Sequence, residues 1–200
     1  MSHLSPEEQH RLDELAYWIR ELFSERGHNI SSALDQDPCF RNGERGRSGL
    51  ARQMMEVAVA SATGKVGLAM TTGDGGVRIV QSIDRGYDRR YRVLSAKKQP
   101  DGAFRILSSS DKILQVGDDS LFGIEEAWVL AYTLDSDNQI ADLFVAQVLD
   151  RLEGQPGELV LGPEYMLAGQ PPTSGGFEPT DEDLPGYDDE EDEGGVSDAG

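Results

Sequence analysis

The stretch that most constrains the fold runs from residue 126 to residue 149, EAWVLAYTLDSDNQIADLFVAQVL. It is the most apolar long segment of the chain, and the polar residues 135 to 139 divide it in two. In residues 128 to 134 both alternating sets of side chains are apolar or small, which is typical of an interior strand covered on both faces. Residues 140 to 149 fit a strand or a helix, and the tight polar turn before them favours the strand. We interpret the segment as the central hairpin of an antiparallel sheet.

Two helices are predicted ahead of the sheet. Residues 5 to 8, SPEE, form a strong helix start, because Ser caps, Pro suits the first helical position and Glu completes a capping box. Apolar residues at helical spacing follow as far as Gly27, which is expected to end the helix. Residues 28 to 47 are expected to form a loop, and a second helix is predicted over residues 48 to 62.

Between the helices and the central hairpin, the apolar spacing changes from helical to strand-like. Candidate strands bounded by turn residues are predicted at residues 66–72, 77–83, 91–96, 103–107 and, after the hairpin, 158–161. We therefore predict one α+β domain over residues 1 to 162, with two N-terminal helices packed on a mainly antiparallel sheet of about six strands built from successive hairpins. Residues 163 to 200 are rich in Pro, Gly and acidic residues, and we predict a disordered tail there.

The charge of the chain, −19, is unevenly distributed. Residues 177 to 200 hold eleven of the 37 acidic residues and none of the 18 basic ones. Cys39 is the single cysteine, so no intrachain disulfide is expected. The first residues lack the pattern of a signal peptide, and no apolar run is long enough to span a bilayer. We expect a soluble, cytoplasmic protein without membrane contacts.

Motifs that carry chemistry are incomplete in this chain. The pair Gly64-Lys65 lacks both the upstream Gly and the following Ser or Thr of a nucleotide-binding loop. Residues 135 to 138 open like a calcium loop, but Ile140 and Ala146 stand where Gly and Glu are needed. The histidines and Cys39 have no zinc spacing. We predict no catalytic, cofactor-binding or metal-binding residue and no cofactor, which favours a non-enzymatic role over a metal-dependent hydrolase or nuclease of unrecognised type.

The contrast between basic and acidic segments is the most informative feature. Residues 85 to 98, RGYDRRYRVLSAKK, hold six basic residues against one acid, with tyrosines interleaved as on nucleic-acid-binding surfaces. The candidate anion-binding or nucleic-acid surface comprises Arg85, Arg89, Arg90, Tyr91, Arg92, Lys97 and Lys98. A secondary basic cluster comprises Arg41, Arg45, Arg47 and Arg52. A plainer interpretation is a charged strand edge that resists aggregation.

Together these features favour a non-catalytic binding or regulatory domain that acts through contacts with a protein partner. The acidic tail would then cover the basic surface, engage a basic partner or simply keep the protein soluble. The alternative is a nucleic-acid-associated protein that uses the basic cluster at residues 85 to 98, with the acidic tail as an internal competitor.

Overall fold

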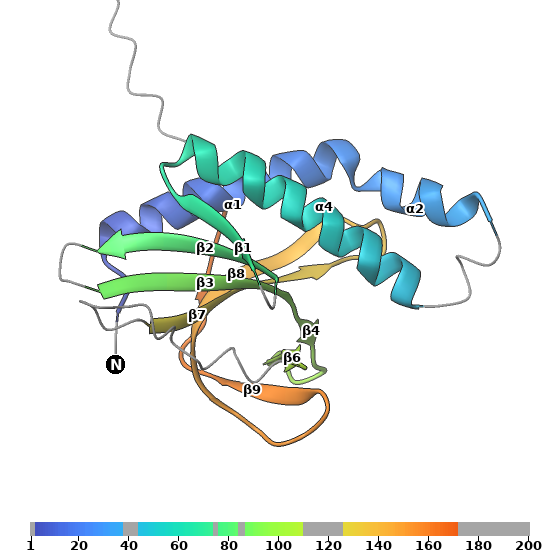
Figure 1. Cartoon of the computed structure of the whole chain (residues 1–200). Coiled ribbons are helices and arrows are strands. Elements are labelled where there is room, and N and C mark those ends of the chain that lie inside the picture. The colour runs from blue at the N-terminus through green and yellow to red at the C-terminus, as the bar shows by residue number, and fades with distance from the viewer. Residues whose placement is uncertain (1–2, 38–43, 74–75, 84–86, 110–125, 172–200) are drawn as a thin grey trace, which may run out of the picture.

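The computed structural model describes residues 3–37, 44–73, 76–83, 87–109 and 126–171. Its helices lie together on one side of a curved sheet (Figure 1). They are α1 (Pro6–Arg26), α2 (His28–Asp35) and α4 (Glu44–Lys65). The predicted α+β class is therefore confirmed. Within the described residues, no helix combines the length and the apolar character needed to cross a bilayer.

Helix α1 begins at the capping box that the sequence predicts. The side chain of Ser5 accepts a hydrogen bond from the backbone N–H of Glu8 at 3.2 Å. In return, Glu8 Oε2 accepts one from the backbone N–H of Ser5 at 2.6 Å. These two bonds satisfy N–H groups that have no partner within the helix. The face that α1 presents to the core consists of Leu12, Leu15, Ala16, Ile19 and Phe23.

Helix α1 ends at Gly27, as predicted, but the loop predicted directly after it is not observed. The φ of Gly27, −55°, is helical, and α2 follows directly within the segment that was expected to be a loop. A side chain at this position would not fit, because a Cβ would lie only 2.7 Å from the backbone oxygen of Asn138. The next helix, α4, starts at Glu44 and ends at Lys65, and is thus longer at both ends than predicted.

The main sheet has eight strands in the order β1-β2-β3-β7-β8-β9-β6, with β10 paired to β8 beside that path. Its strand pairs are antiparallel except for β3 and β7, which are parallel. The main-sheet strands are β1 (Ala69–Gly73), β2 (Gly76–Ile83), β3 (Tyr87–Ser95), β6 (Leu107–Ser108), β7 (Glu126–Leu134), β8 (Ile140–Arg151), β9 (Gly157–Leu161) and β10 (Tyr165–Met166). A separate two-stranded sheet pairs β4 (Lys97–Lys98) with β5 (Phe104–Arg105).

The prediction of a mainly antiparallel sheet is confirmed, but the predicted number of about six strands is too low. Strands β6 and β10 have two residues each, and such short strands leave no alternating pattern in the sequence. The parallel pairing of β3 with β7 also departs from a chain of successive hairpins. A parallel neighbour needs a long crossover connection, which turn residues alone do not reveal.

The central hairpin is confirmed as β7 and β8, which pair antiparallel. Residues 140 to 149 form a strand, as the sequence favours. Trp128, Leu130 and Tyr132 point to the side of the helices, which we call the helix face. Val129 and Ala131 point to the other side, which we call the opposite face, where they belong to a second apolar cluster. Strand β7 is therefore buried on both faces.

The turn of this hairpin is docked onto the helices. Asp135 Oδ1 accepts a hydrogen bond from the backbone N–H of Asp137, which closes the turn locally. Asn138 has a positive φ of 60° and is buried. Its Nδ2 donates to Ser31 Oγ at 2.8 Å, and its Oδ1 accepts from Arg47 Nε at 2.7 Å. The turn thus joins α2 and α4 to the sheet.

The chain remains packed against the domain beyond residue 162. Leu167 is buried, and its backbone N–H donates to the carbonyl of Leu143 at 2.9 Å. The backbone N–H of Ala168 donates to Asp13 Oδ1 of α1 at 3.0 Å. Folded structure therefore continues past the boundary predicted at residue 162. The disordered tail predicted over residues 163 to 200 lies, from residue 172 on, outside the described residues.

Substitution Gly27→Ala is expected to lower the free energy of unfolding by about 1–3 kcal/mol, because the added methyl group overlaps backbone that cannot move aside. The matched control is Gly49→Ala in α4, where a Cβ meets no atom within 4 Å. There the higher helix propensity of Ala should raise stability by about 0.5–1 kcal/mol. Urea unfolding measures both, and equal effects at the two positions would contradict the packing argument.

Candidate anion-binding site

Strand β3 carries most of the predicted basic surface, and its side chains alternate between the two faces of the sheet. Arg89 and Tyr91 belong to the helix face, and both are fully buried. Arg90 and Arg92 belong to the opposite face, in the rows that lead to the apolar cluster around Val129. The arginines of β3 are therefore divided between the helix face, with Arg89, and the opposite face, with Arg90 and Arg92.

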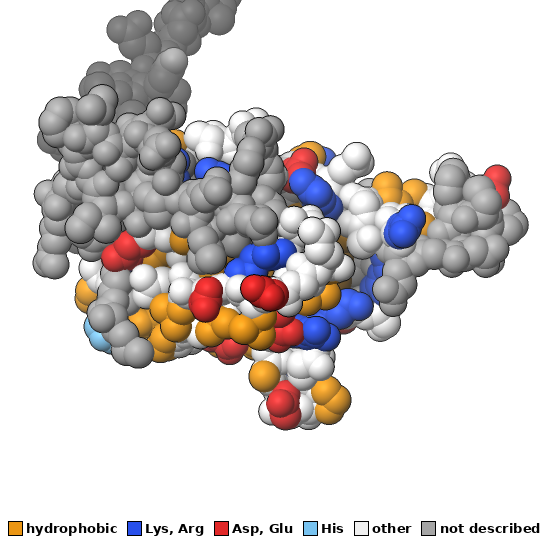
Figure 2. Space-filling model, turned by 60° about the horizontal axis from the view of Figure 1, so that its bottom comes forward, with side chains coloured by type: hydrophobic (Ala, Val, Ile, Leu, Met, Phe, Trp, Pro, Cys, Tyr) orange, Lys and Arg blue, Asp and Glu red, His pale blue; other side chains and the backbone are white. Residues whose placement is uncertain are grey.

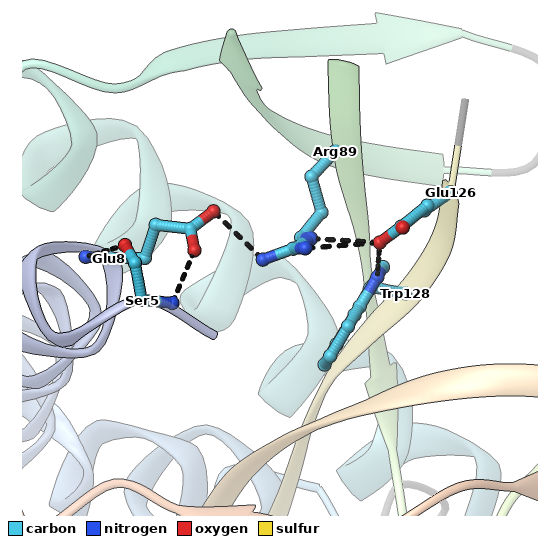
Figure 3. A network of polar contacts seen from close by, with 5 residues as sticks. All are labelled: Ser5, Glu8, Arg89, Glu126 and Trp128. Carbon is cyan, nitrogen blue, oxygen red and sulfur yellow. Dashed lines mark hydrogen bonds and ion pairs between the residues drawn. The ribbon is translucent and has the colours of Figure 1, made fainter. Parts of the chain in front are cut away.

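The contacts on the helix face are organised around Arg89 (Figure 3). Its Nη1 donates to Glu8 Oε1 at 2.8 Å, and its Nε donates to Glu126 Oε2 at 3.1 Å. The same Glu126 oxygen accepts a hydrogen bond from Trp128 Nε1 at 2.9 Å. The guanidinium also lies over the Trp128 ring, 4.7 Å from its centroid. Arg89 thus has two carboxylate partners and an aromatic one, as a buried cation requires.

The charge of Arg89 is stabilised by these neighbours. Burial alone would lower the pKa of Arg89, but Tyr91, Glu8 and Glu126 outweigh burial, so the pKa lies above its ordinary value. Glu8 acts twice, since one oxygen caps α1 and the other binds Arg89. Arg89 and Tyr91 therefore join α1 to the sheet, and neither side chain is exposed to a ligand.

On the opposite face, Arg92 stands directly across from Arg78 of β2. Arg92 is only 4 % exposed, and its Nη2 is buried with no hydrogen-bond partner among the described residues. Arg78 is half-buried, and no described carboxylate pairs with either arginine. Burial lowers the pKa of Arg92, and the like charge of Arg78 lowers it further. The pair is thus two adjacent cations for which the described residues supply no neutralising group.

Arg90 is the third arginine of this face and is half-buried, two residues before Arg92 on the same strand. We call Arg78, Arg90 and Arg92 the Arg78–Arg92 site. On the side turned away from the helices, basic side chains gather near the middle of the visible surface, beside acidic and apolar ones (Figure 2). Guanidinium groups bind carboxylate or phosphate oxygens through paired N–H donors, so an anion fits this arrangement chemically.

The remaining residues of the predicted surface lie elsewhere. Arg85 lies outside the described residues. Lys97 and Lys98 form β4 and are exposed. Lys98 Nζ lies 2.9 Å from Asp142 Oδ1, with which it forms an ion pair. The structure thus places the lysines on a separate small sheet, and the arginines of β3 on the two faces of the main one.

The secondary basic cluster is distributed along α4, on the helix side of the sheet. Arg41 lies outside the described residues, and Arg45 is exposed. Arg47 holds the turn of the central hairpin through Asn138, and Arg52 Nε lies 3.2 Å from Glu56 Oε1. The structure does not bring this cluster together with the Arg78–Arg92 site, because the sheet separates them (Figure 1).

Comparison with known proteins adds no further assignment. No family model, curated protein or solved structure matches this chain. Among the described residues, no group of three or more His, Cys, Asp or Glu could hold a metal ion. The candidate site is therefore defined by the geometry of this chain alone.

Sequence reasoning missed Arg78, which lies outside the basic run at residues 85 to 98. It also missed Glu126 and the second role of Glu8, because their contact with Arg89 joins segments that are far apart in the chain. The available signal was the alternation of β2 and β3, which places Arg78, Arg90 and Arg92 on one face once the register is known.

Substitution Arg89→Met is expected to lower the free energy of unfolding by about 3–5 kcal/mol, because it leaves the buried Glu8 and the half-buried Glu126 without their cation. Glu8→Gln should cost less, since Gln still caps the helix while only the charge facing Arg89 is lost. The exposed pair offers a matched control: Arg52→Met should change stability by less than about 1 kcal/mol. Urea unfolding of the three variants tests this order.

Asp142 introduces a dependence of stability on pH. Partial burial would raise the pKa of Asp142, but hydrogen bonds from Lys98 and Thr133 and the charges of Lys98 and Arg20 outweigh it, so the pKa lies below its usual 3.8. A lowered folded-state pKa stabilises the protein above the unfolded value, and this contribution disappears as the pH falls through the folded-state pKa.

Asp142→Asn should therefore destabilise the protein by roughly 1 kcal/mol at pH 7 and have a smaller effect near pH 3. Thermal unfolding at the two pH values measures the difference. An equal loss at both would show that the carboxylate charge contributes nothing beyond its hydrogen bonds.

Proposed function

We propose that this protein is a non-catalytic binding domain that holds an acidic segment of a protein partner at the Arg78–Arg92 site. The observation that carries the proposal is the buried guanidinium of Arg92, whose Nη2 has no partner among the described residues and which faces the like charge of Arg78. Leaving a charged group buried and unpaired costs several kcal/mol, and a bound anion would remove that cost.

The contrast with Arg89 supports this interpretation. Both arginines lie on β3 and are almost completely buried. Arg89 is neutralised by two carboxylates of its own chain, as a structural cation should be. Arg92 is adjacent to another cation instead. A group that weakens the free protein is typical of a site built for a ligand rather than for stability.

Binding is favoured over catalysis by the chemistry of the site. Arginine stays protonated at neutral pH and donates up to five hydrogen bonds, but it accepts none. Arg78, Arg90 and Arg92 can therefore orient an anion, whereas proton transfer or nucleophilic attack would need a different group. This supports a role in which the protein recognises its partner and leaves it chemically unchanged.

An acidic protein segment fits better than a nucleic acid. Affinity for nucleic acid grows with the number of phosphates that cations neutralise. Of the predicted surface, Arg89 is neutralised internally, Lys98 is paired with Asp142, and the buried Tyr91 offers no ring on which a base could stack. A short carboxylate-bearing segment requires only the few arginines of the Arg78–Arg92 site.

The test uses a fluorescein-labelled hexaglutamate peptide and the full-length protein in low salt, with fluorescence anisotropy as the readout. Arg92→Met should weaken binding about tenfold or more, because one charge-assisted hydrogen-bonding group is lost. In 0.5 M salt, the same variant should also be more stable than the wild type by about 1–3 kcal/mol, because an unpaired buried charge is replaced by an apolar side chain. Arg78→Gln should also weaken binding.

The matched control is Arg11→Gln, which removes one positive charge from an exposed pair on α1 and should leave binding unchanged. Three outcomes would contradict the proposal. Arg92→Met could unfold the protein, which would assign Arg92 a structural role. Arg11→Gln could weaken binding as much as Arg92→Met does. A single-stranded oligothymidylate could bind more tightly than the peptide, which would favour the nucleic-acid alternative.

A further inference from the structure

We infer that the acidic residues 181 to 193 of this chain occupy the Arg78–Arg92 site in the free protein and compete with the external acidic partner, an inference that rests on the proposed function. The C-terminal segment would thus act as a built-in competitor that a stronger ligand displaces.

Charge and composition make this segment a suitable occupant. Residues 188 to 193, DDEEDE, are six consecutive acids, and no basic residue follows Arg151. Such a run presents a carboxylate in almost any alignment, so binding needs no unique register. Arg78 and Arg92 need an anion that no described carboxylate supplies. The segment offers the missing chemical group within the same molecule.

The segment can also reach the site. The described chain ends at Pro171 beside α1, where Ala168 is hydrogen-bonded to Asp13. Residues 172 to 187 then precede Asp188, and sixteen residues span up to about 55 Å when extended. A domain of this size has a radius of gyration of about 15 Å. The chain is thus long enough to pass from the helix side around the sheet to the opposite face.

Tethering makes even a weak contact effective. A flexible connection of this length gives an effective concentration on the order of 1 mM. If the free segment binds with a Kd of about 0.1 mM, the tethered segment occupies the site most of the time. An external acidic ligand then binds about tenfold more weakly than it would to the unoccupied site. The expected size of the effect is therefore measurable.

The experiment compares full-length proteins with the labelled hexaglutamate peptide as probe. In one variant the six consecutive acids are neutralised by D188N, D189N, E190Q, E191Q, D192N and E193Q. This variant should bind the peptide about tenfold more tightly than the wild type in low salt, and the difference should largely disappear in 0.5 M salt. Adding Arg92→Met to the neutralised variant should remove the gain, because the released site is then incomplete.

A matched variant separates docking from net charge. It neutralises six exposed acids on the folded part of the chain, E21Q, E25Q, D101N, D137N, D150N and E153Q. This variant has the same net charge as the first but an intact C-terminal segment, so it should bind the peptide nearly as weakly as the wild type. If it gains as much affinity, general repulsion explains the effect and the inference is wrong.

The two proposals fail in different ways. If the variant with the neutralised segment does not bind the peptide at all, the proposed function itself is wrong. If that variant and the wild type bind it equally well, the Arg78–Arg92 site binds acidic ligands but the C-terminal segment does not occupy it. A gain confined to the first variant and abolished by Arg92→Met supports both.

Discussion

The architecture depends on one buried cation and its two carboxylates. Arg89 is the register partner of Glu126, and this pair opens the parallel pairing between β3 and β7. The opposite side of the guanidinium binds Glu8, whose second oxygen caps α1. Removing Arg89 would leave both carboxylates without their cation, at a cost of several kcal/mol. Arg89 thus holds together the start of α1, strand β3 and the start of strand β7.

The same strand that carries this structural cation also carries the candidate site. Successive residues of β3 alternate between faces, so Arg89 faces a helix while Arg92 faces away from it. On the helix face the cation has partners from α1 and β7. On the opposite face the register brings Arg78 beside Arg92, and no described carboxylate forms an ion pair with either of them. The candidate site therefore lies where the described residues leave the charge of Arg92 uncompensated, three residues along the strand from Arg89, whose charge they do compensate.

Local features were readable from the residues themselves. The capping box of Ser5 and Glu8, the two-sided burial of β7 and the strand character of residues 140 to 149 all follow from patterns within a few residues. Features that depend on contacts between residues far apart in the sequence could not be predicted. Gly27 ends α1 as predicted, but the sequence did not reveal that the missing side chain also admits the backbone of Asn138. The parallel neighbours β3 and β7 are separated by residues 96 to 125, and no local pattern in so long a connection predicts that the two strands pair.

The sequence by itself determined the α+β class, the central hairpin, the first helix start and the separation of a basic run from an acidic end. These follow from periodicity, turn chemistry and composition, which are local properties of the chain. Only the tertiary structure decided which basic residues are structural and which are candidates for binding. Burial and charge compensation depend on residues far apart in sequence, since Arg89 meets its partner Glu8 81 positions away. The sequence predicted a strand only over residues 91–96, whereas β3 begins at Tyr87. Which face would receive two carboxylates and which would receive Arg78 was set by strand order and register.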